Sequence, residues 1–348
     1  MRYFALAVPG VGTLVAEEIS RHPAFAPSFD GSFDGRNDVV PFVSVKSTLE
    51  PFDFRSCEDV YVEVALTTRA TDLPQLVRDL SDDKALARGL SIYAHYVRRL
   101  HPRMRYRVVT RVRSERRYRR TQLRDALVGE LSRQRPKWLP ADPAELEIWV
   151  LETKPGLFRS GIRLTDASMR HRAPREIERI AALRPSVAGA MVTSANLPPG
   201  ATLLDPFCGS GTILREALSL GLRAVGSDND PVAVEAARVN APAATVDEAD
   251  ARQLPFADGV VDAVVTNLPF GGTYRISAPL PSWFREVLGE LRRVTRAGGT
   301  ITLLVPVSDA LTGAIATNDC LQIVRRMPVR LLGFPTCIWQ LRRKYQHQ

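Results

Sequence analysis

The chain lacks the features that mark secreted and membrane proteins. Its four cysteines, Cys57, Cys208, Cys320 and Cys337, lie far apart and form no CxxC pair, which argues against a disulfide framework or a zinc site. No run approaches the ~18 apolar residues that a membrane span needs. The short apolar run at the N-terminus is interrupted by Pro9, which predicts a first strand instead of a signal peptide. These absences predict a reduced, cytoplasmic protein without a metal centre.

Lysine is also scarce, with five residues against 42 arginines in a chain of net charge +9. Arginine carries a planar fork that matches phosphate and stacks on bases, so its dominance favours RNA as a partner. The 348 residues predict two or three domains at roughly 100–200 residues each. A content of 45% hydrophobic and 24% charged residues is typical of globular domains that fold without disulfides.

The positive charge is concentrated in the middle of the chain. Residues 98–180 carry 22 basic and 10 acidic side chains, and Arg98–Arg124 holds twelve arginines with one acid. Tyr106, Tyr118 and Trp138 lie within or near this segment, which also favours binding of RNA. The alternative is a solvated face in an arginine-rich composition. The predicted RNA-binding residues are Arg98, Arg99, Arg103, Arg105, Arg107, Arg111, Arg113, Arg116, Arg117, Arg119, Arg120 and Arg124.

The first half of the chain predicts a mixed α+β region. Its stretch 22–38 is rich in Pro, Gly, Asp and Phe and indicates a loop or hairpin. The alternation in Arg105–Arg113 predicts a strand with arginines on one face, and Thr121 is a candidate N-cap for the helix after it. The other expected strands are Val39–Val45, Cys57–Thr67, Glu145–Thr153 and Gly156–Leu164, and the helices are Leu14–Ser20, Leu73–Leu80, Lys84–Leu100 and Thr121–Arg133.

After a polar, basic stretch near 168–184, strands alternate with amphipathic helices. This alternation predicts a parallel, doubly wound sheet, and a tightly joined closing pair predicts an antiparallel hairpin at its edge. The strands are Thr202–Asp205, Arg223–Asp228, Ala243–Val246, Val260–Thr266, Thr300–Val305, Ile323–Leu332 and Pro335–Leu341, and the helices are Pro185–Ala195, Thr212–Leu220, Pro231–Asn240 and Trp283–Arg293.

The motif DPFCGSGT, Asp205–Thr212, stands at the first strand-to-helix junction of this half. A glycine turn lets the backbone approach a ligand, and the helix N-terminus offers free N–H groups. A dinucleotide fingerprint needs a third glycine three residues after the second. Leu214 holds that position after Gly209 and Gly211, so NAD is disfavoured. The acid at the strand end suits a ligand with an ammonium group, such as S-adenosylmethionine. Cys208 is interpreted as a packing residue and not as a nucleophile, because no histidine is near it in sequence.

Two further acids follow the next strands. Asp228 closes the second strand, where a carboxylate can accept both ribose hydroxyl hydrogens of a nucleoside. Asp250 follows the third strand and can accept from an adenine amino group. Any one of these acids is readily explained as a helix N-cap. Together with Asp205, three acids at three successive strand ends favour a nucleoside ligand.

The tetrad Asn267-Leu268-Pro269-Phe270 directly follows the fourth strand. An exocyclic amine of a nucleobase is a poor nucleophile, because its lone pair is delocalised into the ring. The Asn267 side-chain carbonyl and the backbone carbonyl of Leu268 or Pro269 can accept its two hydrogens and direct the lone pair outward. Phe270 offers a face for stacking. The alternative is a plain Pro-Gly turn after a strand.

In this order, DPFCGSGTILREA, GSDNDPVAVEAA, ADARQLPF and TNLPFG resemble a class I S-adenosylmethionine-dependent amino-methyltransferase. The sequence NLPF resembles the Asn/Asp-x-Pro-Phe/Tyr tetrad of exocyclic-amine methylases. The basic first half, ending in Gly156–Leu164 and the Leu183–Ala188 lead-in, is similar to the THUMP-containing RNA methyltransferases. Among these, the chain resembles the tRNA guanine-N2 methyltransferases that act on the acceptor stem, at position 6.

The resemblance implies an α/β fold with a C-terminal Rossmann-like class I methyltransferase after an α+β ferredoxin-like/THUMP RNA-binding region. The implied parts are a ferredoxin-like part at 1–56, a THUMP-like domain at 57–167, a linker at 168–184 and a methyltransferase domain at 185–348. A monomer that grips the 3′ end and acceptor stem of tRNA is expected. The implied catalytic residues are Asn267, Leu268, Pro269 and Phe270; the implied S-adenosylmethionine-binding residues are Asp205, Pro206, Phe207, Gly209, Gly211, Thr212, Asp228, Asn229, Asp250, Ala251 and Asn267.

Two alternatives to tRNA guanine-N2 methylation stay open. The first alternative is the same chemistry on ribosomal RNA guanine or on DNA adenine, because the tetrad does not distinguish guanine from adenine. A THUMP-like module favours RNA. The second is a non-catalytic RNA-binding protein with a vestigial methyltransferase fold. The presence of Asp205, Asp228, Asp250 and Asn267 together argues against it.

Overall fold

The computed structural model divides the chain into two compact units, Met1–Arg170 and His171–Gln348. It describes residues 1–46, 48–68, 72–114, 117–166, 169, 171–172, 175–179, 182–269, 279–306, 308–331 and 334–345. Each unit is built around its own sheet. Among the described residues, no helix combines the length and apolarity that a bilayer crossing requires.

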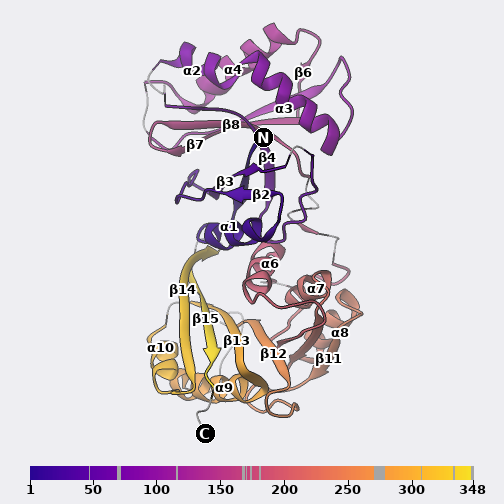
Figure 1. Cartoon of the computed structure of the whole chain (residues 1–348), viewed down its shortest axis with the longest axis vertical. Helices are drawn as coiled ribbons and strands as arrows, with labels where there is room; N and C mark the ends of the chain where they lie inside the picture. The colour runs from indigo at the N-terminus through magenta and orange to yellow at the C-terminus, as the bar shows by residue number, and fades with distance from the viewer. Residues whose placement is uncertain are drawn as a thin grey trace. The chain divides into compact units, whose positions relative to one another are not determined.

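The N-terminal unit holds one eight-stranded sheet in the order β2-β3-β1-β4-β8-β7-β5-β6 (Figure 1). Strand β1 pairs with β3 on one side and with β4 on the other. The domain boundary expected at 56/57 therefore falls within a continuous sheet. The strands are β1 (Arg2–Ala7), β2 (Phe25–Pro27), β3 (Asp38–Ser44), β4 (Asp59–Thr67), β5 (Arg105–Arg111), β6 (Leu139–Pro140), β7 (Leu146–Lys154) and β8 (Leu157–Arg163).

The N-terminal helices agree with the expected pattern except at some ends. The helix expected to reach Leu100 ends at Tyr96. The stretch 22–38, expected as a loop or hairpin, contributes β2, which pairs antiparallel with β3. Thr121 is not an N-cap: Arg119 holds that position, and its backbone N–H donates to Gln122 Oε1 at 2.6 Å. The helices are α1 (Gly12–Arg21), α2 (Leu73–Leu80), α3 (Asp83–Tyr96) and α4 (Arg120–Gln134).

The C-terminal unit holds a seven-stranded sheet in the order β11-β10-β9-β12-β13-β15-β14. Strands β9 to β13 run parallel, and β15 is antiparallel to both β13 and β14. The strands are β9 (Thr202–Asp205), β10 (Arg223–Asp228), β11 (Thr245–Glu248), β12 (Val261–Asn267), β13 (Thr295–Pro306), β14 (Leu321–Leu331) and β15 (Phe334–Arg343), and the helices are α6 (Pro185–Ser194), α7 (Thr212–Ser219), α8 (Pro231–Asn240), α9 (Leu280–Val294) and α10 (Asp309–Ala316).

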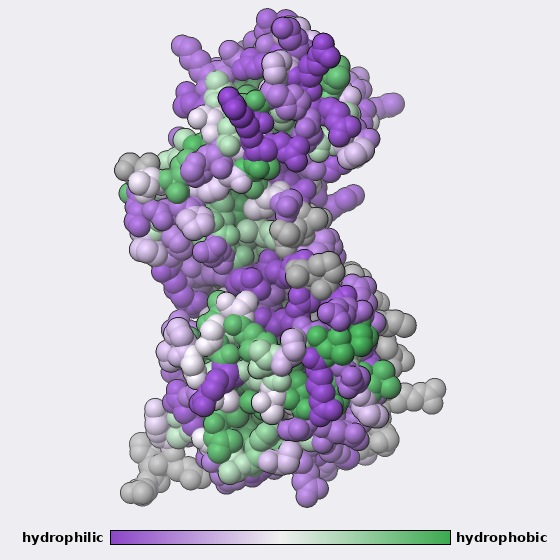
Figure 2. Space-filling model, turned by 90° about the vertical axis from the view of Figure 1, so that its right-hand side faces the viewer, coloured by the Kyte–Doolittle hydropathy of each residue, from purple (hydrophilic) through white to green (hydrophobic). Residues whose placement is uncertain are grey.

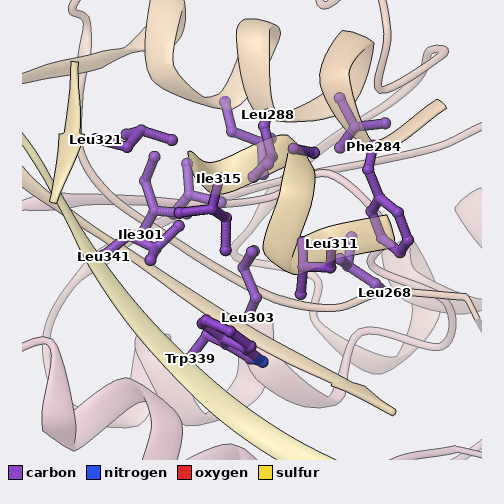
Figure 3. Packing of buried hydrophobic residues seen from close by; sticks show 14 of the residues in the cluster. Leu268, Phe284, Leu288, Ile301, Leu303, Leu311, Ile315, Leu321, Trp339 and Leu341 are labelled. Atoms are coloured by element: carbon purple, nitrogen blue, oxygen red, sulfur yellow. The ribbon is translucent and has the colours of Figure 1, made fainter. Parts of the chain in front are cut away.

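Helices cover both faces of this second sheet (Figure 1). Helices α9 and α10 pack on one face through a buried cluster that includes Leu288, Ile315, Leu303 and Trp339 (Figure 3). On the other face, Gln340 Nε2 in β15 donates to the last carbonyl of α6 at 2.8 Å. The doubly wound sheet with its antiparallel edge hairpin, expected from the alternation of strands and helices, is therefore confirmed. The sequence pattern missed α10.

We expect Leu303→Ala to lower the free energy of unfolding of the C-terminal unit by about 2–5 kcal/mol. Leu303 is fully buried at the centre of the cluster, so its truncation loses packing contacts and leaves a cavity. Urea denaturation of the full chain measures the change. Val232→Ala is the control, because Val232 is 65% exposed on α8 and its truncation is worth less than about 0.5 kcal/mol. Equal effects of the two substitutions would contradict the prediction.

Candidate functional site

The glycine turn after β9 has the backbone that its sequence requires. Gly209 and Gly211 adopt φ values of 52° and 80°, in the left-handed region that favours glycine. The Gly211 N–H donates to the Cys208 carbonyl at 2.8 Å and closes the turn at the start of α7. A Cβ on Gly211 would come within 3.2 Å of the Ala237 backbone, whereas one on Gly209 would meet open space. The Gly209 side of the turn thus leaves room for a ligand.

Cys208 packs inside this turn. Its side chain is 5% exposed, and a Cβ on Gly226 of β10 would lie 3.1 Å from the Cys208 Cβ. Burial raises the pKa of the Cys208 thiol, and the neighbouring Asp205 and Asp228 add to the rise. A thiol that resists ionisation is a poor nucleophile. The geometry therefore agrees with a packing role.

Asp205, at the end of β9, is 1% exposed. Its Oδ1 accepts a hydrogen bond from Thr266 Oγ1 at 2.7 Å and from the Phe207 backbone N–H at 3.2 Å. Burial raises the pKa of Asp205 to about 7, against these two hydrogen bonds, which favour the ionised form. Nearby Asp228 adds a small further rise. A buried carboxyl in this state gains most from a cationic partner.

Asp228, at the end of β10, is joined to the glycine turn. Its Oδ2 accepts from the Gly209 N–H at 2.9 Å, and its Oδ1 accepts from the Asp230 N–H at 3.1 Å. Burial raises its pKa, while the two backbone N–H groups oppose the rise. The structure therefore brings Asp205, Gly209 and Asp228 together at the carboxyl ends of β9 and β10. The neighbouring Asn229 is exposed.

Asp250 lies after β11 and forms an ion pair with a neighbouring arginine. Its carboxylate pairs with Arg252, with a shortest separation of 2.7 Å, and that guanidinium holds its pKa below the usual range. Both side chains are more than two-fifths exposed. The adenine contact expected for Asp250 would have to share this carboxylate with Arg252. Ala251, beside it, is buried.

Asn267 ends β12 with an unsatisfied acceptor. Among the described residues its buried Oδ1 has no hydrogen-bond partner. Leu268 fixes the backbone that follows, since its N–H donates to the Leu304 carbonyl at 3.0 Å and its side chain joins the core cluster (Figure 3). Pro269 is half-buried, and Phe270 lies outside the described residues. A buried side-chain carbonyl without a partner is costly, so it fits a donor supplied by a ligand.

Sequence reasoning missed three contributors to this site. Thr266 links Asp205 to the strand that carries Asn267. Trp283 of α9 lies beside Phe207, with ring centroids 5.8 Å apart. Such partners leave no mark in a local pattern, because each comes from a distant element. The other implied residues are placed at the turn itself: Pro206 and Thr212 are buried, and Phe207 is partly buried.

The third missed contributor is Asn240, at the end of α8. Its Oδ1 accepts from the Glu176 and Ile177 N–H groups at 2.9 and 3.2 Å. Its Nδ2 donates to the Ile177 and Ser210 carbonyls at 2.8 and 3.0 Å. Asn240 thereby joins the stretch before α6 to the glycine turn. The described residues contain no group of three or more His, Cys, Asp or Glu side chains placed to hold a metal ion.

In the N-terminal unit, several of the arginines expected at an RNA face are held by the protein itself. On β5, Arg107 pairs with Glu147 at 2.8 Å and with Asp142 at 3.1 Å. Arg111 pairs with the buried Asp34. These guanidinium groups are bound to acids far away along the chain, which a count of local charge misses. Three others have partners too: Arg98 with Glu145, Arg113 with the carbonyls of Phe33 and Thr153, and Arg124 with Asp125.

The three aromatic residues of this segment do not support an RNA-binding face. Tyr106, Tyr118 and Trp138 are 0%, 8% and 8% exposed, so their rings belong to the core and offer no face to a base. On the face that Figure 2 shows, hydrophilic side chains cover much of the N-terminal unit, with smaller apolar patches among them. Arg116 lies outside the described residues. The exposed arginines that have no side-chain partner within the described ranges are Arg99, Arg103, Arg105, Arg117, Arg119 and Arg120.

Comparison with known proteins agrees with this geometry. Residues 172–332 match the family model of the RMKL-like methyltransferase domain. A segment of 141 residues is 35% identical to the U6 snRNA (guanine-N(2))-methyltransferase THUMPD2 of Bos taurus, covering 38% of this chain and 27% of that protein. Another of 119 residues is 37% identical to the tRNA (guanine(6)-N2)-methyltransferase of Thermus thermophilus, covering 32% of this chain and 35% of that protein. The chain thus spans about a third of the length of these relatives.

The fold is shared over a longer stretch. The crystal structure of TrmN from Thermus thermophilus superposes with a TM-score of 0.78 at 22% identity, covering 98% of this chain and 99% of that one. This similarity includes the N-terminal α+β unit as well as the C-terminal one. The C-terminal unit has the α/β fold of a class I methyltransferase domain.

Proposed function

We propose that this chain is an S-adenosylmethionine-dependent methyltransferase acting on the exocyclic N2 of guanine in RNA. One observation carries the proposal: the buried, unpartnered Oδ1 of Asn267, at the end of β12, beside the strand end that holds Asp205. The names of the relatives support guanine-N2 chemistry on RNA. S-adenosylmethionine supplies a methyl group activated by its sulfonium.

The described side chains fit this cofactor. Asp205 would pair with its ammonium group, because a buried carboxyl without a cation of its own gains from that charge. Asp228 would accept from the ribose hydroxyls and keep its bonds to the turn. The open space at Gly209 admits the ligand to the backbone. Asp250 would be the adenine contact, shared with Arg252.

Asn267 would orient the target amine. Its Oδ1 accepts one N2 hydrogen and a carbonyl of the following turn accepts the other, which leaves the nitrogen lone pair free. The packing of Leu268 in the core holds this turn in place. The protein then contributes by orientation and needs no strong base. The guanine must leave its stacked position to reach the strand ends.

The RNA would be tRNA, methylated in the acceptor stem. Arg117, Arg119 and Arg120 lie at the N-terminus of α4, whose first turn contains no acidic residue. Cations there are disfavoured unless an anion binds, so this end of α4 suits a phosphate. We assign 1–56, 57–167, 168–184 and 185–348 to a ferredoxin-like part, a THUMP-like domain, a linker and the methyltransferase domain. We also propose a cytoplasmic monomer.

Cofactor binding should tighten as pH rises towards 7. Burial raises the pKa of Asp205 to about 7, so at lower pH a proton must leave before the carboxylate can pair with the ammonium group. An α-amino group with a pKa of roughly 7.7–8.0 stays charged in this range. We expect the Kd for S-adenosylmethionine to fall almost tenfold per pH unit below about 6.5 and to level off near 7.5.

Calorimetry across this pH range tests the role of Asp205. Asp205→Asn is the matched variant, since it keeps the size of the side chain and removes its titration. It should bind weakly and without this pH dependence. The same slope in both proteins would contradict the assigned role.

Asn267→Ala should reduce methyl transfer at saturating substrate by about 100-fold or more, because the amine loses its orientation. Binding of the cofactor and of RNA should change little. Asn267→Asp is the conservative control: it keeps an acceptor oxygen and should retain more activity than the alanine variant. Release of N2-methylguanosine from tRNA incubated with labelled cofactor is the measurement. Wild-type product that is N6-methyladenosine, or label confined to ribosomal RNA, would overturn the proposed substrate.

Neutralising the cations at α4 should weaken tRNA binding and flatten its salt dependence. For Arg117→Ala, Arg119→Ala and Arg120→Ala combined, we expect the slope of log K against log salt to fall by about 2–3. Arg88→Ala, an exposed arginine on α3, is the control and should leave the slope unchanged. A slope that stays constant in the triple variant would identify these arginines as a solvated face.

A further inference from the structure

The β14–β15 hairpin carries basic side chains and no acidic ones, and the proposed function assigns them no role. From Leu321 to Gln348 the sequence holds six basic residues and no acid. This hairpin forms one edge of the C-terminal sheet, with β14 as the last strand (Figure 1, yellow). The net charge of the C-terminal half does not reveal this excess of basic residues, because acidic residues within 181–320 offset it. A cationic edge strand also resists pairing with another sheet, so the charge alone does not identify a ligand.

The side chains divide into structural and available cations. Arg343 donates to the Arg293 carbonyl at 3.1 Å and to the Thr295 carbonyl at 2.5 Å, so it supports β13. Arg325 donates to Gln340 Oε1 at 2.8 Å. Among the described residues, four others are exposed and have no acidic partner: Arg326, Arg330, Arg342 and Lys344.

Arg326 is oriented in advance for an anion. Its Cζ lies 4.3 Å from the centroid of the Trp339 ring, and Trp339 is 1% exposed and fixed in the core. Stacking uses none of the N–H donors of the guanidinium, and a hydrogen bond to the Cys337 sulfur uses one of the five. Because Arg326 has no carboxylate partner among the described residues, it keeps its charge and its remaining donors for a phosphate.

The strand register places these cations near the proposed target site. Asn267 is level with Leu304 of β13, Leu304 with Ile338 of β15, and Ile338 with Met327 of β14. Three strand spacings of about 4.8 Å therefore separate Asn267 from Met327, or roughly 14 Å. Arg326 adjoins this level. Arg330 lies beyond it, towards the sheet edge at which β12 and β13 also end, because β14 runs parallel to both.

We propose that Arg326 and Arg330 of the hairpin bind backbone phosphates of the RNA strand next to the target guanine. The inference rests on the proposed function, since it takes the register from Asn267. The basic charge favours a polyanion as the ligand. Because the strand register places the two arginines close to Asn267, the substrate RNA is favoured over an unrelated acidic partner. The C-terminal unit would then contact the RNA itself and would not depend on the N-terminal arginines alone.

The test compares Arg326→Ala/Arg330→Ala with wild type in the full chain, using unfractionated tRNA as the probe. Each phosphate contact contributes about 0.7–0.9 to the salt slope, so the double variant should lower the slope by roughly 1.5. KM for tRNA should rise with kcat and cofactor affinity unchanged, because neither residue lies at the reacting groups. Arg326→Lys/Arg330→Lys should recover most of the slope, which separates lost charge from misfolding. Arg223→Ala, at the start of β10, removes an exposed arginine elsewhere and should leave the slope unchanged.

The outcomes separate this proposal from the function on which it rests. An unchanged slope in the double alanine variant, with normal methylation by wild type, overturns the hairpin contact and keeps the proposed function. A lowered slope in a protein that methylates no RNA keeps the contact and overturns the function. A wild-type chain that does not bind tRNA overturns both.

Discussion

The hydrogen bond from Thr266 to Asp205 joins the two halves of the candidate site. It runs from β12 to β9, across the point where the order of strands reverses. On one side of it lie the glycine turn and Asp228, which suit a nucleoside; on the other lies Asn267, which suits an amine. Because parallel strands end at one edge, the two sets of side chains face the same space. Their separation is therefore set by the sheet and not by flexible loops.

Burial determines the chemistry of these groups. Burial raises the pKa of Asp205 to about 7, and it leaves Asn267 Oδ1 without a hydrogen-bond partner among the described residues. Both arrangements cost folding free energy, and a ligand that brings a cation to one and an N–H donor to the other relieves the cost. On an exposed loop, water would satisfy the same groups, and they would gain little from a ligand. This explains why the two positions carry more weight than the half-exposed Asp250.

The arginines show that charge density and available charge are different quantities. In the segment Arg98–Arg124, Glu147 of β7 and Asp34 of a loop neutralise Arg107 and Arg111, whereas the cations at the start of α4 stay exposed. In the hairpin, the total charge is smaller, yet Arg326 is held by the Trp339 ring and the Cys337 thiol and keeps its other donors. Electrostatic attraction of RNA therefore depends on which partner each guanidinium already has.

The sequence by itself determined the order of strands and helices in the C-terminal half apart from α10, the glycine turn, and the acids and amide at the strand ends. These features are local: periodicity, turn residues and motif spacing are all read within a few residues. Only the tertiary structure decided that Thr266 binds Asp205, that Tyr106 and Trp138 are core, and which of the arginines on β5 are paired with acids. Each of these depends on contacts between elements distant along the chain, and local spacing carries no information about them.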